Sequence, residues 1–271
     1  MIPGGPVAEA LERLDAITRR LRVECPWDRE QDERSIVPHT VEEAYELADA
    51  AHRSDDAKLL DELGDVLFQV YFLSLLLEER GAGSLAQVAE HVTEKLIRRH
   101  PHVFGEAEAE SAGEVLRNWD RIKQDEPGRE PGLFGDVPEN LPGPLYARKV
   151  QRRAASSGFD FPDVAPVIDA AREELDELEA AAEREDQSDQ AREARFHELG
   201  DLLFAVVNIA RKLRVDPELA LRASSDRFRG RVSTASELAA LEGRSWNDLR
   251  PDEQLSYYTR ARLAEGEPHD Q

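Results

Sequence analysis

The feature that most constrains this chain is an internal repeat. The block EEAYE (42–46) precedes ELGDVLFQV (62–70) in the first half, and EELDE (173–177) precedes ELGDLLFAV (198–206) in the second. Seven of the nine positions of the longer block match, and basic residues follow it in both halves. Two blocks repeated in one order indicate a duplicated supersecondary unit, so both halves are expected to fold alike.

Apolar residues recur three and four positions apart along most of the chain, which predicts helices. The expected helical segments are 7–22, 38–52, 56–80, 84–100, 112–124, 146–156, 163–186, 190–213, 216–242 and 251–263. Five prolines and four glycines between Asp125 and Ala147 interrupt this pattern, because neither residue continues a helix well. Period-two alternation is rare, so we expect an all-α fold with tandem helical-bundle domains at 1–124 and 146–263. A linker at 125–145 joins the two domains, and a tail follows at 264–271.

The acidic composition limits the partners of this protein. A net charge of −22 disfavours nucleic acid and anionic membrane surfaces, because both require a basic face. The apolar run from Val66 to Leu77 is too short to span a bilayer, and the N-terminal residues lack the pattern of a signal peptide. Cys25 is the only cysteine, which excludes an internal disulfide,. We therefore expect a soluble, cytoplasmic protein with no nucleic-acid or membrane partner.

The repeated acids have the spacing of a metal site. Residues three apart share a helix face, so Glu43 and Glu46 project together, as do Glu62 and Asp65. If the two helices fold back antiparallel through a loop from Arg53 to Leu60, all four carboxylates converge. Clustered carboxylates in a partly dry seam repel one another unless cations neutralise them. Oxygen-only ligands suit Mg²⁺, with Mn²⁺ as a second possibility.

The second half offers the same ligand set at matching positions. Its candidate metal ligands are Glu174, Glu177, Glu198 and Asp201. Each half also carries a glycine beside its last acid, Gly64 or Gly200, at a helix-interior cost of roughly 1 kcal/mol. A close helix contact at the metal seam is the expected reason for both glycines.

The residues quoted above resemble the MazG family of nucleoside triphosphate pyrophosphohydrolases. The family signature ExxE…ExxD occurs twice, and the stretches CPWD (25–28), KLIRRHPHVF (95–104) and GFD (158–160) are also similar to the family. The resemblance extends over roughly residues 8–260. It implies a helical fold, a homodimer with composite sites, Mg²⁺ dependence, and hydrolysis of nucleoside triphosphates to the monophosphate and pyrophosphate. The resemblance also favours the second domain as the catalytic one, although all four acids occur in both.

Three further groups of residues are candidates for this chemistry. The additional acids Glu42 and Glu173 are candidates for accepting a proton from the attacking water, directly or from outside the metal ligands. Basic residues four apart on a helix are candidates for binding the triphosphate, and an aromatic residue near each domain end is a candidate for contacting the nucleoside. The basic and aromatic candidates are Lys95, Arg99, Arg227, Arg231, Trp119 and Tyr258. A solvated basic face and ordinary core packing are the competing interpretations.

Two other functions are compatible with parts of the pattern. A di-iron carboxylate bundle also uses Glu pairs on helices, but it requires Glu-x-x-His on two of them. That tetrapeptide does not occur in this sequence. The second alternative is a non-catalytic module that senses nucleotides or binds a helical partner, and release of pyrophosphate with and without EDTA distinguishes it from an enzyme.

Overall fold

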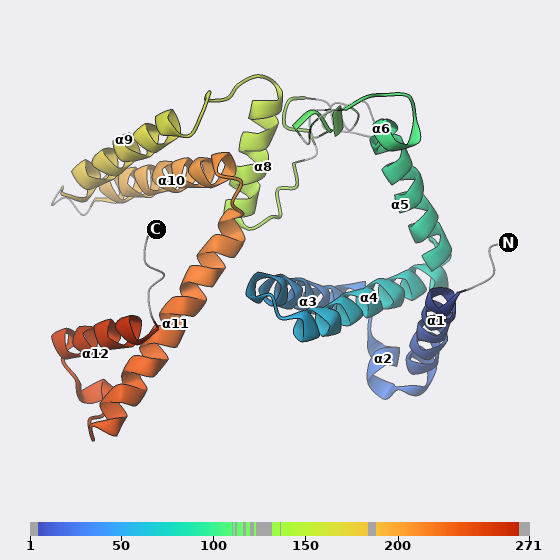
Figure 1. The fold of residues 1–271 in the computed structure, drawn as a ribbon, viewed down its shortest axis with the longest axis horizontal. Coiled ribbons are helices and arrows are strands. Elements are labelled where there is room, and N and C mark those ends of the chain that lie inside the picture. The colour runs from blue at the N-terminus through green and yellow to red at the C-terminus, as the bar shows by residue number, and fades with distance from the viewer. Residues whose placement is uncertain are drawn as a thin grey trace. The chain divides into compact units, whose positions relative to one another are not determined.

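Every regular element of the computed structural model is helical within the residues that it describes (Figure 1). These residues are 5–109, 111, 113–115, 118–119, 122, 132–135, 137–183 and 188–265. The chain divides into two compact units, Met1–Glu126 and Pro127–Gln271, which are described separately. No helix in the described part of the chain is long and apolar enough to cross a membrane.

The first unit is organised around one pair of long helices. Its helices are α1 (Pro6–Glu24), α2 (Pro26–Glu30), α3 (Glu33–Arg53), α4 (Asp56–Glu79), α5 (Leu85–Arg99) and α6 (Pro101–Phe104). Helices α3 and α4 lie antiparallel, with α1 against α4. Ile36 on α3 packs in a buried cluster with Phe72 and Leu76 on α4. This packing holds the acidic faces of α3 and α4 next to each other.

The beginning of α3 and the turn after it differ from the sequence-based expectation. Asp32 and Ser35 form a reciprocal capping box, so α3 begins at Glu33 and continues through Pro38. The expected loop from Arg53 to Leu60 is wrong, because only two residues separate α3 from α4. Ser54 adopts a left-handed conformation with φ 55°, and the side chain of the next residue, Asp55, already accepts from the backbone N–H of Lys58 at the start of α4.

The second unit contains two separate helix pairs. Its elements are α8 (Gly143–Ser156), α9 (Ala165–Ala182), α10 (Asp189–Lys212), α11 (Pro217–Leu241), the short 3-10 helix η1 (Trp246–Asp248) and α12 (Pro251–Ala264). Helix α9 pairs with α10, α11 pairs with α12, and α8 packs against both α10 and α11. The α11–α12 core consists of Ala235, Ala239, Leu249, Tyr257 and Ala261. Small residues on α11 let α12 approach closely.

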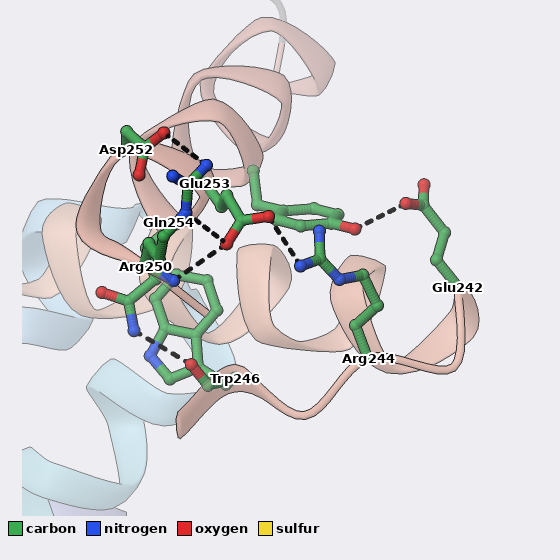
Figure 2. Close-up of polar contacts among 8 residues, drawn as sticks. Glu242, Arg244, Trp246, Arg250, Asp252, Glu253 and Gln254 are labelled. Carbon is green, nitrogen blue, oxygen red and sulfur yellow. Dashed lines mark hydrogen bonds and ion pairs between the residues drawn. The ribbon is translucent and has the colours of Figure 1, made fainter. Parts of the chain in front are cut away.

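A polar network joins α11 to α12 through η1 (Figure 2). The Glu253 carboxylate accepts hydrogen bonds from Arg244 Nη2 at 2.7 Å and from the backbone N–H of Arg250 at 3.0 Å. Gln254 Nε2 donates to the carbonyl of Trp246 at 2.9 Å. These contacts satisfy the backbone N–H of Arg250, just before α12, and hold η1 against that helix.

Some expected boundaries fall outside the described residues or differ from them. Outside the described part lie residues 125–131 and 136 of the expected linker at 125–145, and residues 266–271 of the expected tail. Residues 113–115, 118–119 and 122 of the expected helix at 112–124 are helical. Helix α8 begins at Gly143, inside the expected linker, because Pro144 occupies its first turn, where a missing N–H costs no hydrogen bond,.

Candidate carboxylate sites

Three carboxylates converge between α3 and α4. Glu43 of α3 and Glu62 and Asp65 of α4 each place one oxygen within 4.8 Å of the other two. The Glu62 side chain is 3% exposed, whereas Asp65 is exposed. Glu62 Oε2 is buried and has no hydrogen-bond partner in the part of the chain that the structure describes. A buried carboxylate oxygen without a donor is costly, so this atom is suited to a cation.

The second unit repeats this arrangement between α9 and α10. Glu174 of α9 and Glu198 and Asp201 of α10 also have carboxylate oxygens within 4.8 Å of one another. Glu174 and Glu198 are half-buried and Asp201 is exposed. The same three repeat positions therefore converge in both units, which a chance surface cluster does not explain.

The same physical causes raise the pKa of Glu43 and of Glu174. Burial raises the pKa of Glu43 most, followed by the charges of Asp65, Glu46, Glu62 and Glu42. Burial and the neighbouring charges therefore disfavour the ionised form of both carboxyl groups, and a nearby cation would stabilise that form.

For Glu174 the order of causes is the same. Burial raises the pKa of Glu174 most, followed by the charges of Asp201, Glu177, Glu198 and Glu173. The additional acid Glu173 thus acts on Glu174 as Glu42 acts on Glu43. The two sites match in charge as well as in position.

The donor set fits a hard divalent cation. Opposite ligands of Mg²⁺ lie about 4.2 Å apart, since each bond is 2.0–2.1 Å long. The three oxygens of each group lie within 4.8 Å of one another, so an inward movement of the side chains would bring them around one such ion. Beside Asp65 and Gly64, the surface has an open hollow of about 640 Å³ that also borders Lys58 and Asp61.

The fourth acid of each predicted set lies outside the convergent group. Glu46 instead accepts a hydrogen bond from Lys58 Nζ at 3.5 Å, and the same ammonium lies 2.7 Å from Glu62 Oε1. The hydrogen bond to Glu62 raises the pKa of Lys58 most. Glu177 is exposed and influences Glu174 only by its charge. Sequence reasoning missed Lys58, although its position four residues before Glu62 was the available signal.

The two additional acids have different surroundings from the convergent ones. Glu42 is 68% exposed and lies 3.3 Å from Nδ1 of His39. Glu173 is also exposed. Both acids border their site at its solvent side.

The expected reason for the two glycines is wrong within the described structure. A Cβ added at Gly64 or at Gly200 would meet no atom within 4 Å. Among the described residues, no close helix contact therefore requires either glycine.

The basic candidates lie on helices other than those that carry the acids. Lys95 and Arg99 belong to α5, and Arg227 and Arg231 belong to α11. Within each unit, α5 and α11 lead away from the helix pair that carries the acids (Figure 1). Arg231 Nε donates to Glu265 at 2.8 Å. Within each unit, the described residues therefore do not bring these bases and the acids of that unit into one pocket.

The aromatic candidates pack against neighbouring rings. Trp119 lies 5.6 Å from the ring of His100, and its buried Nε1 has no hydrogen-bond partner among the described residues. Tyr258 lies 5.7 Å from the ring of Phe228. The hydrogen bond to Glu265 raises the pKa of Arg231 most, and Tyr258 raises it next. Tyr258 and Arg231 thus form one surface across α11 and α12.

Sequence comparison relates this chain to known proteins, and the matched residues include the first carboxylate group. A model described as the MazG nucleotide pyrophosphohydrolase domain matches residues 31–104, which include the first carboxylate group. The nucleoside triphosphate pyrophosphohydrolase of Escherichia coli strain K12 is 40% identical over 238 residues, which are 86% of this chain and 89% of that protein. The nucleoside triphosphate pyrophosphohydrolase/pyrophosphatase MazG of Thermotoga maritima is 38% identical over 250 residues, 91% of this chain and 93% of its own length.

Proposed function

This chain belongs to the MazG family, and from this premise we propose that it hydrolyses nucleoside triphosphates to the monophosphate and pyrophosphate with Mg²⁺. The observation that carries the proposal is the convergence of three carboxylates at matching positions in both units. Relatives similar over most of their length are named for this reaction. Removal of unwanted nucleotides from the cellular pool is the proposed role.

The acids of each unit have separate proposed tasks. Mg²⁺, or Mn²⁺ in its place, would neutralise phosphate charge and lower the pKa of a bound water. The convergent acids would hold the ion directly, and Glu46 and Glu177 would complete the set after a side-chain rotation. Glu42 and Glu173, at the solvent side, would accept the proton of the attacking water.

The basic and aromatic residues are proposed to serve the substrate. The triphosphate would be bound by Lys95, Arg99, Arg227 and Arg231. The nucleoside would be contacted by Trp119 and Tyr258. Arginine suits this task because its planar fork binds phosphate oxygens in pairs. Since these residues lie on helices that lead away from the acids, we propose that they reach the acids of a second copy of the chain.

A homodimer is further supported by a repeated apolar stripe. Four apolar side chains on α4 are at least 37% exposed, and four on α10 are at least 46% exposed. They are Leu60, Leu63, Leu67 and Val70 on α4, and Phe196, Leu199, Leu203 and Val206 on α10. The two sets occupy the same repeat positions, and Gly64 and Gly200 lie within them. A helix of a second copy would cover such a stripe, and the glycines would let it approach closely.

Substitution of one ligand in each unit tests the activity. Glu62→Gln and Glu198→Gln remove the charge while nearly keeping the shape, and each should lower pyrophosphate release from its own unit by about 10–100-fold. If both units are active, each single variant retains part of the release and the double variant loses it. If only the second is active, Glu198→Gln alone abolishes release.

An exposed acid on α9 provides the control. Glu179→Gln should leave release unchanged, because Glu179 is outside the convergent group. Full activity of the double variant, with unchanged helical content, would contradict the carboxylate assignment. Binding of nucleotide without release in the unaltered protein would favour a nucleotide sensor instead.

A further inference from the structure

Lys58 lies within the first carboxylate site. Its Nζ lies 2.7 Å from Glu62 Oε1 and 3.5 Å from Glu46 Oε2. Glu62 is 3% exposed, and its other oxygen is buried without a partner. One oxygen of the most buried candidate ligand is therefore already paired with a cation that belongs to the chain.

The matching position of the second unit carries no charge. Ala194 precedes Glu198 by four residues, as Lys58 precedes Glu62. Among the described residues, no ion pair involves the Glu198 carboxylate. The two sites have the same acids, but within the described residues only the glutamate of the first, Glu62, is paired with a cation.

We propose that Lys58 is an internal counter-ion that competes with divalent metal for Glu62, so that the first site binds metal more weakly than the second. This inference rests on the proposed function only in assigning these acids to the metal. A metal ion must displace an ammonium from Glu62, whereas in the second unit it only relieves repulsion among acids. Metal loading therefore begins in the second unit.

Titration of the full chain with Mn²⁺ tests the competition. The electron paramagnetic resonance signal of the free ion measures how much Mn²⁺ remains unbound. The first site is isolated by Glu198→Gln with Asp201→Asn. In that protein Lys58→Met removes the charge and nearly keeps the side-chain length, and it should tighten Mn²⁺ binding on the order of tenfold. Lys58→Arg keeps the charge and should leave binding weak.

A matched control separates a local effect from a change in net charge. Arg20→Met also removes one cation from the first unit, where Arg20 pairs with Glu24 at 2.9 Å on the exposed surface of α1. The Mn²⁺ affinity of this variant should equal that of its parent. An equal gain in affinity for Arg20→Met and Lys58→Met would overturn the proposal.

The reverse substitution tests the second site. In a protein that carries Glu62→Gln and Asp65→Asn, Ala194→Lys should weaken Mn²⁺ binding by a similar factor. If Lys58→Met does not fold, this variant decides the question, and an unchanged affinity overturns the proposal. Unchanged or weaker Mn²⁺ binding by folded Lys58→Met also overturns it, because Lys58 then does not compete.

Pyrophosphate release by the unaltered chain separates this inference from the proposed function. If release occurs but Lys58→Met does not change Mn²⁺ binding, the competition is refuted and the activity stands. If Mn²⁺ binding changes as expected but no nucleoside triphosphate is hydrolysed, the activity is refuted and the competition stands.

Discussion

At the residue scale, the acids of each candidate site repel one another, and a bound cation would offset that repulsion. Burial and the neighbouring acids raise the pKa of both Glu43 and Glu174. A carboxyl whose pKa is raised by folding opposes the folded state once it ionises. Such sites lower the free energy of unfolding of the metal-free protein, and they allow it to hold a cation.

Neutralising Glu43 should therefore stabilise the metal-free chain. In EDTA at pH 7, Glu43→Gln should raise the Tm, because glutamine removes an anion from a crowded site. The advantage should disappear below the ordinary carboxyl pKa of 4.5, where glutamate is protonated in both the folded and the unfolded state. Mn²⁺ should raise the Tm of the unaltered protein more than that of the variant, since stabilisation by a ligand of the folded state grows as its Kd falls.

Glu174→Gln provides the parallel measurement in the second unit. It should also raise the metal-free Tm, and Glu179→Gln serves as the control on the same helix. A lower metal-free Tm for both site variants, measured by circular dichroism, would show that the ionised acids support the fold instead.

A second prediction at this scale concerns Glu253 at the start of α12. The hydrogen bonds from Arg244 and from the Arg250 backbone lower the pKa of Glu253 to about 2. A lowered pKa contributes stability above the unfolded value of 4.5, and this contribution is lost as the pH falls toward 2,. Glu253→Gln should therefore lower the Tm at pH 7, and the difference from the unaltered protein should shrink between pH 4.5 and 2.

The control for Glu253 is an exposed ion pair in the same unit. Asp169 accepts from Arg172 at 2.7 Å with both side chains exposed, so Asp169→Asn should scarcely change the Tm. Equal effects of Glu253→Gln and Asp169→Asn at all pH values would contradict the role of the α11–α12 network.

At the element scale, the turn between α3 and α4 positions the first site. Only two residues connect the helices, and Ser54 adopts φ 55° and ψ 36°. The left-handed region is unfavourable for a residue with a Cβ and costless for glycine. This short turn keeps Glu43 and Glu62 at the same level of the helix pair.

Ser54→Gly should consequently stabilise the first unit. The relief of strain is expected to be about 0.5–1 kcal/mol, which raises the Tm by roughly 1–4 °C in a chain of this size. Ser84→Gly is the matched control, because Ser84 is extended with φ −148° and its hydroxyl caps α5. That variant should lower the Tm or leave it unchanged, and a higher Tm for both would argue against relief of strain.

At the scale of the whole molecule, the repeated apolar stripe predicts the assembly. Light scattering on the eluting protein should give about twice the chain mass of 30.5 kDa. Leu63→Glu with Leu203→Glu places a charge in each stripe and should shift the mass toward one chain. If bases from one copy serve acids of the other, pyrophosphate release should fall with dimer content.

Charge substitution at another exposed leucine controls for solubility effects. Leu241 is 84% exposed and lies at the end of α11, outside both stripes, so Leu241→Glu should leave the mass and the release unchanged. A single-chain mass for the unaltered protein at micromolar concentration, with release retained, would contradict the dimer proposal.

The sequence by itself determined the helical class, the repeat and the positions of the acids. These properties are local, because a spacing of three or four residues already decides which side chains share a helix face. The limits of α4, α5 and α10 lie close to those expected from periodicity alone. Periodicity did not predict the short elements α2 and η1, because five and three residues are too few to display a helical period.

Only the tertiary structure decided how these faces meet. The two-residue turn and the packing of Phe72 against Ile36 fix how α4 is rotated against α3. That rotation buries Glu62, leaves Asp65 exposed and moves Glu46 out of the convergent group toward Lys58. Burial and the choice of ion-pair partner depend on distances between helices, which the spacing within one helix does not contain.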